Sequence, residues 1–352
     1  MNDWKTVRLG DVCEKGSSNI AQNEITDNNG EYPIYGAAGF IKNVDFYKQE
    51  KPYIGIVKDG AGVGRVSIHP AKSSLIVTMQ YIFPKENIDI KFLAEFLKYQ
   101  NLSRFYTGAT IPHIYFKDYQ NIPLKLPSLQ KQKLISAVLG KCTELIVKNK
   151  TILEKYDTLI KSRFIEMFGT EKDFSKWNCC CVEDVADVTV GVVIKPTQYY
   201  CEKGIPAFRS LNIGEMKVND SDWVYFTEAG NEKNKKSILK ENDVLVVRSG
   251  APGKSCVITK KYEGYNVVDA IIAHPNLEKV NPVFLCMFTN MPHGMNQIKA
   301  KTGGAAQQHF NVGGYNALKM ILPPLSLQND FSAFVQQIDK SKFEYTYIGV
   351  AA

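Results

Sequence analysis

The sequence lacks any long apolar segment. No run of apolar residues approaches the roughly 18 that a membrane-spanning helix needs. The first residues, Met1 to Lys5, lead into no apolar stretch of the kind that a secretion signal contains. We therefore expect a protein that is neither secreted nor embedded in a membrane and that works in the cytoplasm.

The sequence also lacks the spacing of a metal site or a disulfide scaffold. Its eight cysteines include no Cys-x-x-Cys pair, and three of them, Cys179 to Cys181, are consecutive. Consecutive residues of a strand point to opposite faces, so these three cannot all reach one metal ion. The five histidines form no His-Glu-x-x-His motif. We expect reduced thiols and no bound metal.

Catalytic and nucleotide-binding motifs are incomplete. Residues 250–255 end like a P-loop, but Arg248 stands where the first glycine is required, which favours a turn after a strand. Residues 60–65 are rich in glycine without the Gly-x-Gly-x-x-Gly spacing. Residues 281–284 lack the second proline of the Asn-Pro-Pro-Tyr/Phe loop of amino-methyltransferases, and we interpret them as the start of a helix. The sequence therefore predicts no catalytic residues.

Positive charge is in only slight excess. The 352 residues include 43 Lys and Arg against 36 Asp and Glu, a net charge of +7. More than half of this excess lies in residues 128–169, at +4, against +2 in residues 1–127 and +1 in residues 170–352. Net charge is therefore a weak indication of a nucleic-acid partner, and DNA contacts would have to come from local clusters. The hydrophobic fraction of 44% excludes a disordered chain.

What the sequence does contain is an internal repeat. Residues 108–114 align with residues 304–310 at an offset of 196. The same offset aligns Tyr119 with Tyr315, Pro127 with Pro323, Leu129 with Leu325, and Gln132 with Gln328. Between these anchors, Lys58-Asp59-Gly60-Ala61 corresponds to Arg248-Ser249-Gly250-Ala251 after a short β-like run in each copy. So many matches in register indicate a duplicated domain.

Each copy begins in the same way and has mixed secondary structure. Trp4 and Trp177 are each followed at matching places by Leu or Val, then Asp and Val. Short runs of aromatic and β-branched residues come next, broken by Gly and Asn, with one or two helices such as residues 90–101. Regular alternation of strands and helices is missing, so we predict an α+β fold.

A long helix is predicted after each copy. Residues 129–168 contain no proline and a single glycine, and Gly169 follows as a natural C-cap. Apolar residues recur along this segment at steps of three and four, which is coiled-coil spacing. The second helix, from Leu325, keeps such spacing for only about 20 residues, or roughly 30 Å. The stripe that we expect to bind partners comprises Val138, Leu145, Ile152, Leu159 and Phe164.

The combination of these features is specific. Two halves each begin with Trp-x4-Leu/Val-x-Asp-Val, end with a small-residue loop before a histidine, and pass through Pro-x-Leu-x-x-Gln into a long helix. Over nearly the whole chain this layout resembles the specificity (S) subunit of type I restriction-modification systems. The resemblance implies an α+β protein in which two similar target-recognition domains are separated by long conserved helices that form an antiparallel coiled coil. The implied boundaries are residues 1–127 and 171–324 for the recognition domains, 128–170 for the spacer helix, and 325–352 for a truncated second helix.

The resemblance also implies a function. An S subunit is a non-catalytic DNA-binding protein whose two recognition domains each read one half of a bipartite, asymmetric sequence in double-stranded DNA. It directs two methylase (M) subunits, docked on its helices, and the restriction (R) subunits to that target. S-adenosylmethionine, ATP and Mg bind the partner subunits, so we expect no cofactor on this chain.

By the same resemblance, the residues that face DNA are polar and basic ones in the loops of each copy. Lys and Arg neutralise phosphates, and Gln or Arg can read base edges. His113 and His309 occupy the same place in both copies; each either contacts DNA or holds the shape of its own loop, and the two roles are compatible. The full set is Lys58, Arg65, Thr110 and His113 in the first copy, and Arg209, Arg248, Lys254, Gln308 and His309 in the second.

Three other interpretations stay open. The short second helix departs from the family pattern, which suggests a truncated or silent-cassette S subunit that acts only with a second polypeptide. The chain can also be interpreted as a structural coiled-coil adaptor without DNA readout, or as an enzyme with unrecognised motifs. Salt-dependent and sequence-dependent binding to duplex DNA separates an S subunit from an adaptor, and the missing cofactor loops argue against an enzyme.

Overall fold

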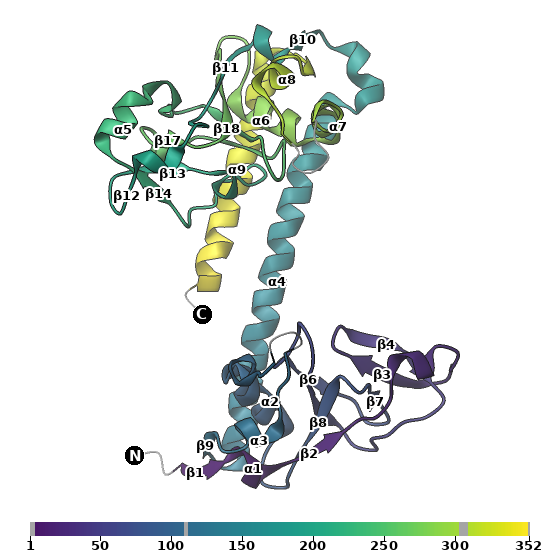
Figure 1. The fold of residues 1–352 in the computed structure, drawn as a ribbon. Helices are drawn as coiled ribbons and strands as arrows, with labels where there is room; N and C mark the ends of the chain where they lie inside the picture. The colour runs from purple at the N-terminus through teal and green to yellow at the C-terminus, as the bar shows by residue number, and fades with distance from the viewer. Residues whose placement is uncertain (1–3, 109–111, 303–308, 351–352) are drawn as a thin grey trace. The chain divides into compact units, whose positions relative to one another are not determined.

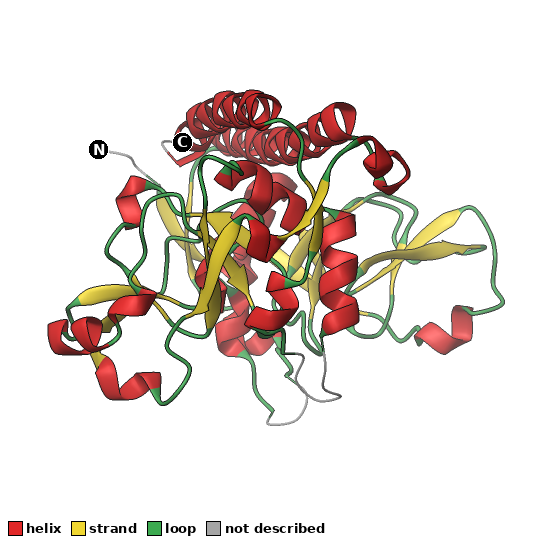
Figure 2. Cartoon of the chain, turned by 90° about the horizontal axis from the view of Figure 1, so that it is seen from above, coloured by secondary structure: helices red, strands yellow, loops and turns green. Residues whose placement is uncertain are grey.

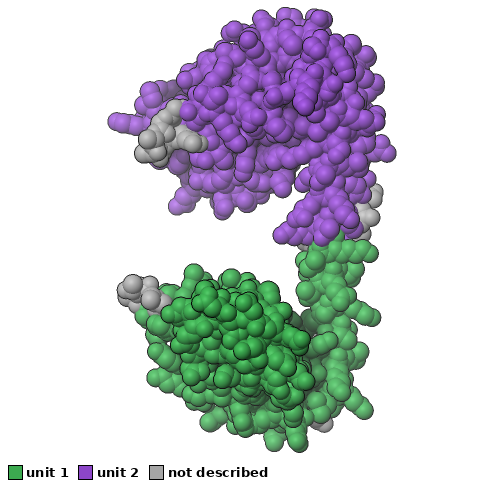
Figure 3. All heavy atoms as spheres, turned by 90° about the vertical axis from the view of Figure 1, so that its right-hand side faces the viewer, with its two compact units in different colours: residues 1–148 green, residues 149–352 purple. Residues whose placement is uncertain are grey.

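The computed structural model describes residues 4–108, 112–302 and 309–350 (Figure 1). The chain divides into two compact units, unit 1 at residues 1–148 and unit 2 at residues 149–352 (Figure 3). Each unit has its own sheets and its own apolar core. Figure 2 shows the helices, strands and loops of the chain by colour. Within the described ranges, no helix is both long and apolar enough to cross a membrane.

Unit 1 is built on a four-stranded antiparallel sheet. Its strands are β1 (Lys5–Arg8), β2 (Cys13–Ser17), β3 (Tyr32–Gly36), β4 (Gly39–Val44), β5 (Tyr53–Val57), β6 (Val66–His69), β7 (Ser74–Leu75), β8 (Met79–Pro84) and β9 (Pro123–Leu126), and its short helices are α1 (Leu9–Val12), α2 (Ile90–Tyr99) and α3 (Phe116–Tyr119). The main sheet has the order β2-β8-β5-β6. A smaller sheet has the order β4-β3-β7, and β1 pairs with β9.

The core of unit 1 forms where α2 packs on the main sheet. Strand β5 is buried along its whole length, because residues 53–57 carry apolar groups on both faces. Helix α2 begins where the Asp89 carboxylate accepts a hydrogen bond from the backbone N–H of Phe92. It ends at Tyr99, earlier than the sequence indicated, because Asn101 adopts a left-handed backbone conformation with φ of 48°.

Unit 2 is built on a sheet of the same kind. Its strands are β10 (Cys179–Cys181), β11 (Ala186–Val190), β12 (Tyr200–Cys201), β13 (Ile205–Phe208), β14 (Val224–Phe226), β15 (Val244–Val247), β16 (Ser255–Val257), β17 (Asn266–Val267), β18 (Ala270–Pro275) and β19 (Lys319–Ile321), and its short helices are α5 (Glu228–Lys233), α6 (Pro282–Asn290), α7 (Pro292–Lys301) and α8 (Val312–Asn316). The main sheet has the order β11-β18-β15-β16, and a second sheet has the order β12-β14-β13-β17. Helix α6 begins as predicted, with the Asn281 side chain accepting from the backbone N–H of Val283 at 2.9 Å.

The two units repeat one topology. The order β2-β8-β5-β6 in unit 1 corresponds to β11-β18-β15-β16 in unit 2, and neighbouring strands are antiparallel in both sheets. The first strand of each unit pairs with the strand that precedes a long helix, β1 with β9 and β10 with β19. The predicted internal repeat is therefore confirmed.

Helix α4 (Leu129–Phe168) has the predicted bounds and passes from unit 1 into unit 2 (Figures 1 and 3). Its last turns belong to the core of unit 2. Phe164 and Phe168 are each 1% exposed, and their rings lie 4.9 to 5.8 Å from those of Phe284 and Phe331. Phe164, which we expected on the partner-binding stripe, is thus covered by residues of its own chain.

Helix α9 (Leu325–Val350) lies alongside the part of α4 that belongs to unit 2 (Figure 1). The two helices are antiparallel, because Phe164 contacts Phe331, whereas Asp157, earlier on α4, pairs with Lys342, later on α9, at 2.8 Å. The predicted antiparallel pair of long helices is confirmed. Helix α9 is longer than its apolar spacing indicated, because that spacing reports burial and a helix can continue without a buried face.

A buried glutamine fastens α4 to the globular part of unit 1. Gln132 has 0% exposure, and its Oε1 accepts from the backbone N–H of Asp89 at 2.8 Å. Its Nε2 donates to the carbonyl oxygen of Pro127 at 2.9 Å and of Asn87 at 3.2 Å. The amide therefore ties the first turn of the helix to two backbone segments.

The aligned glutamine of unit 2 does the same for α9. Gln328 has 0% exposure; its Oε1 accepts from the backbone N–H of Asn281 at 2.9 Å, and its Nε2 donates to the carbonyl oxygens of Pro323 at 2.8 Å and Lys279 at 3.5 Å. The two aligned glutamines therefore attach the two long helices to their units in the same way.

Gln132→Ala should lower the free energy of unfolding by about 2–4 kcal/mol, because it leaves a backbone N–H and carbonyl groups buried without partners. Gln130, exposed on the same helix, provides the matched control, and Gln130→Ala should change stability by less than about 0.5 kcal/mol. Urea unfolding of the full chain, followed by circular dichroism, measures both. Equal stability of the two variants would contradict the fastening role.

Candidate nucleic-acid interface

In both units, predicted DNA-facing residues gather at one hairpin of the main sheet. In unit 1 this hairpin joins β5 to β6, beginning at Lys58 and ending at Arg65. In unit 2 the corresponding hairpin joins β15 to β16, beginning at Arg248 and ending at Lys254. The structure therefore brings these four residues to equivalent places in the two copies.

Glycines close both hairpins in the same way. The backbone N–H of Gly64 donates to the carbonyl of Val57 at 2.8 Å, and that of Gly253 donates to the carbonyl of Val247 at 2.9 Å. Both glycines have positive φ, 85° and 97°, and a Cβ on Gly64 would lie 2.4 Å from the backbone N of Ser103. The segment that resembles a P-loop is thus a turn between two strands, as we predicted.

His113 joins this hairpin in unit 1. It forms a β-bridge with Asp59, and its Nδ1 lies 2.6 Å from Oδ1 of Asp59. The other carboxylate oxygen of Asp59 accepts from the Lys58 ammonium group. The backbone N–H of Ile114 donates to the carbonyl of Lys58 at 2.9 Å, which continues the link between the two segments.

His309 joins the hairpin of unit 2 at the equivalent place. It forms a β-bridge with Ser249, and its Nδ1 lies 2.9 Å from Oγ of Ser249. Arg248 Nη1 donates to Oδ1 of Asp269 at 3.1 Å. Arg248 Nε donates to the carbonyl of Phe310 at 3.3 Å, and the N–H of Phe310 returns to the carbonyl of Arg248 at 2.9 Å.

The basic residues of the two hairpins differ in how far their charge is already neutralised. Lys58 and Arg248 are paired with carboxylates, and their side chains are 27% and 19% exposed. Arg65 and Lys254 are exposed, and Arg65 donates from Nη1 to the carbonyl of Ala37 at 3.0 Å. Solvent-facing positive charge at the hairpins therefore comes mainly from the residues at their far ends.

The remaining predicted residues fall outside the two clusters. Arg209 follows β13, in the second sheet of unit 2, and donates to the backbone carbonyl of Asp222. Thr110 and Gln308 lie outside the described residues. Sequence reasoning did not single out Asp59, Ser249 or Asp269. The repeat aligns Asp59 with Ser249, and this alignment could have identified both residues. No sequence pattern pointed to Asp269.

The other three histidines have structural partners. His69 is buried between β5 and the ring of Tyr35, and burial lowers its pKa to about 4, so the ring is neutral. His274 lies 2.6 Å from Asp243, and His293 lies 2.8 Å from Glu171. Within residues 4–108, 112–302 and 309–350, no group of three or more His, Cys, Asp or Glu residues is arranged to hold a metal ion.

All eight cysteines lie in the described part of the chain, and all are free. Burial raises the pKa of the Cys13 and Cys286 thiols to about 12, so both stay protonated near neutral pH. Burial also raises the pKa of Cys180 to about 11.

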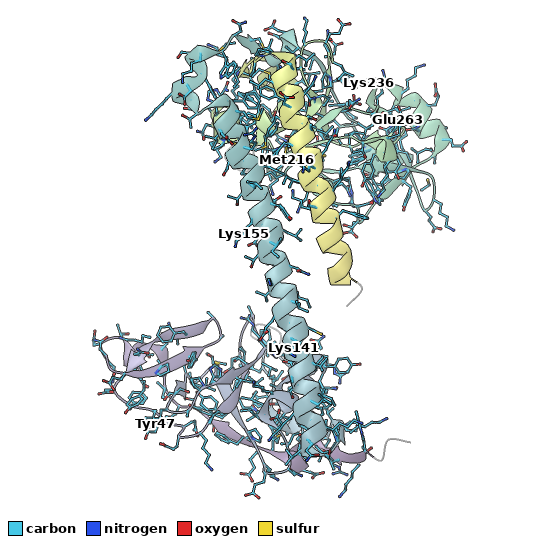
Figure 4. All side chains as sticks on the ribbon, turned by 180° about the vertical axis from the view of Figure 1, so that it is seen from behind. Tyr47, Lys141, Lys155, Met216, Lys236 and Glu263 are labelled. Carbon is cyan, nitrogen blue, oxygen red and sulfur yellow. The ribbon has the colours of Figure 1, made fainter. Side chains whose placement is uncertain are left out.

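Helix α4 carries exposed apolar residues along much of its length. Val138, Leu145 and Leu159 of the predicted stripe are 53%, 56% and 46% exposed, and Ile152 is half-buried. Further exposed apolar residues on the helix are Leu134, Leu139 and Ile146. Basic side chains such as Lys141 and Lys155 also stand on this helix (Figure 4).

A family comparison identifies the layout. The family described as "Type I restriction modification DNA specificity domain" matches residues 1–162 and 174–347. The chain belongs to this family. The match is interrupted close to the end of α4, so one part of the specificity-domain match covers unit 1 with most of α4, and the other covers most of unit 2.

Curated relatives carry the same designation. The chain is 25% identical over 279 residues to the type I restriction enzyme MjaVIII specificity subunit of Methanocaldococcus jannaschii, a match that covers 69% of this chain and 63% of the relative. It is 26% identical over 162 residues to the EcoDI specificity subunit of Escherichia coli, covering 45% of this chain and 35% of the relative. The chain thus matches less than two thirds of the length of these relatives.

Solved structures share the fold. The type I restriction-modification S subunit from M. genitalium superposes with a TM-score of 0.63 at 14% identity, covering 99% of this chain and 93% of that one. A chain from a structure that describes complex assembly and conformational transition of the type I system gives a TM-score of 0.55 at 14% identity, covering 99% and 94%. At this level of identity the likeness establishes the α+β specificity-subunit fold.

Arg248→Ala should lower the stability of unit 2 by about 1–3 kcal/mol, because it leaves Asp269 without its cation and removes a bond to the Phe310 carbonyl. Arg248→Lys should lie in between, since an ammonium group can keep the ion pair but not both bonds. Lys254→Ala, at the exposed end of the same hairpin, is the control and should have little effect. Scanning calorimetry orders the three variants, and an Arg248→Ala protein as stable as Lys254→Ala would refute the internal role.

Proposed function

We propose that this chain is the DNA specificity subunit of a type I restriction-modification complex, in which units 1 and 2 each recognise one half of a bipartite, asymmetric sequence in double-stranded DNA. The observation that carries this proposal is that the β5–β6 hairpin of unit 1 has a counterpart in the β15–β16 hairpin of unit 2. Basic residues and a histidine stand at equivalent places on two copies of one sheet, while the loops around them differ. Two domains that recognise different half-sites need DNA-contacting positions in equivalent places that carry different side chains.

The length of α4 supports an unread gap between the half-sites. The helix has 40 residues, which corresponds to roughly 60 Å. That length exceeds the 34–36 Å of one turn of B-DNA. We assign target recognition to residues 1–127 and 171–324, with residues 128–170 and 325–352 as the conserved helices, and with Phe164 and Phe168 of α4 contributing to the core of unit 2.

The basic residues are proposed to act mainly on the phosphates. Arg65 and Lys254 are exposed and have no carboxylate partner among the ion pairs of the described residues, so they can contact the DNA backbone, whereas Lys58 and Arg248 are held by carboxylates and contribute more to the shape of the hairpin. Arg209, Thr110 and Gln308 stay candidates for contacts from neighbouring loops.

The exposed apolar part of α4 is the proposed docking surface for the methylase. Apolar side chains that are about half exposed on a long helix are usual where a partner covers them. We propose two M subunits and, through them, R subunits, with S-adenosylmethionine, ATP and Mg bound by those partners. The chain itself is proposed to be non-catalytic and to act in the cytoplasm.

Methylome sequencing of cells that carry this chain with its methylase tests the function directly. We expect one bipartite adenine-methylation motif. Replacing residues 1–127 with the corresponding part of another family member should change one half of the motif only. A motif without two parts, or a change in both halves, would contradict the proposal, and an adaptor without DNA readout would give no motif at all.

Leu145→Asp should weaken co-purification of the methylase by about tenfold or more, because a carboxylate on a covered apolar surface is left unpaired. Thr143→Asp is the matched control, since it introduces the same charge about 200° around the same helix. Leu145 is 56% exposed, so neither change should alter thermal unfolding of the isolated chain. Equal retention of methylase by both variants would place the docking surface elsewhere.

A further inference from the structure

The two hairpin clusters use the same positions but exchange two residue types. Val57 pairs with Met79 in unit 1, and Val247 pairs with Ala270 in unit 2, so the residues just before Met79 and Ala270 are equivalent. We call the four positions the hairpin cluster. Its members are Lys58, Asp59, Thr78 and His113 in unit 1, and Arg248, Ser249, Asp269 and His309 in unit 2.

Each cluster contains one carboxylate and one hydroxyl, on opposite positions. In unit 1 the carboxylate is on the hairpin, at Asp59, and the hydroxyl precedes β8, at Thr78. In unit 2 the hydroxyl is on the hairpin, at Ser249, and the carboxylate precedes β18, at Asp269. The exchange keeps one basic residue, one acid and one histidine in each copy.

In unit 1 the carboxylate acts on the histidine directly. Oδ1 of Asp59 lies 2.6 Å from Nδ1 of His113, and a carboxylate can only accept a hydrogen bond. The proton of this bond therefore lies on Nδ1. A neutral imidazole that is protonated at Nδ1 has its acceptor at Nε2. Oγ1 of Thr78 takes no part, and it is among the buried side-chain atoms of the described residues that have no hydrogen-bond partner.

In unit 2 the same result is reached through a relay. Ser249 donates its single hydroxyl proton to Oδ2 of Asp269 at 3.1 Å. Its Oγ, 2.9 Å from Nδ1 of His309, can then only accept, so the proton of that bond also lies on the histidine. Asp59 in unit 1 and the Ser249–Asp269 pair in unit 2 thus both favour the histidine tautomer that is protonated at Nδ1.

We propose that Asp59 and Asp269 are positioning residues for DNA recognition, which hold the histidine of each unit with Nδ1 protonated. In unit 1, His113, whose side chain is 39% exposed, thereby presents Nε2 as an acceptor to an exocyclic amino group in the major groove. Such groups are the N6 amine of adenine and the N4 amine of cytosine, whereas guanine and thymine present carbonyl acceptors at the corresponding place, so His113 favours adenine or cytosine over guanine or thymine on the strand that it faces, at one position of its half-site. This inference rests on the function proposed above.

The exchange itself supplies the test. Asp59→Ser leaves a hydroxyl beside His113 without a carboxylate to fix its proton, so the preference for one tautomer is lost. Discrimination at one base pair of the unit 1 half-site should fall about tenfold, whereas the unit 2 half-site is unchanged. Adding Thr78→Asp to the same protein rebuilds the arrangement of unit 2 and should restore discrimination to within about threefold of the original.

The readout is the methylation motif of the full chain with its methylase, together with selection of bound duplexes from a randomised library. Glu95→Ala removes a surface ion pair with Lys98 in the same unit and is the matched control. The reciprocal exchange, Ser249→Asp with Asp269→Thr, repeats the test in unit 2 if the double variant of unit 1 does not fold; there the expected result is an unchanged motif, and the Asp269→Thr single variant should relax the unit 2 half-site alone.

Three results would overturn the positioning role: an unchanged half-site in Asp59→Ser, a loss spread over both half-sites, or a folded double variant that recovers no discrimination. Recovery by the double variant cannot come from general stabilisation, because only the base preference of one half-site is scored. If the unmodified chain shows no bipartite motif, the proposed function fails, and this outcome differs from all three.

Discussion

A buried glutamine side chain in the first turn of each long helix fixes that helix to its sheet-containing unit. Gln132 and Gln328 bind backbone groups alone: one N–H and two carbonyls in each unit. Because the main chain offers the same groups whatever its side chains are, this attachment tolerates almost any sequence in the loops beyond it. The recognition surfaces can therefore diverge while the helices stay fixed to their sheets.

The C-terminal end of α4 is held mainly by the packing of apolar side chains. There, aromatic side chains interlock, and Phe164 and Phe168 pack with residues of α6 and α9 inside unit 2. The helix is thus a connector at its beginning and a core element at its end. A recognition module cut at residue 171 would lose two fully buried aromatic rings, so the natural boundary of unit 2 lies well inside the helix.

The sequence predicted the internal repeat and those features that depend on neighbouring residues alone, such as the bounds of a helix. The offset of 196 located both glutamines, and proline, glycine and apolar spacing placed the bounds of α4 correctly. Coiled-coil spacing could not show that Phe164 is buried by its own chain, because apolar periodicity does not name the covering surface. The pairing of Arg248 with Asp269 depends on the register of β15 against β18, and the separation of Arg209 from the cluster depends on which sheet holds β13. Neither register nor sheet membership can be predicted from residue types alone.

The carboxylate and the hydroxyl of the hairpin cluster have a consequence for how such sequences should be compared. Position by position, Asp59 against Ser249 and Thr78 against Asp269 count as two unrelated, non-conservative differences. As a pair they are one change that preserves composition and proton placement. Sequence variation across these domains should therefore be coupled between the two positions, and an acid at either one predicts its absence from the other.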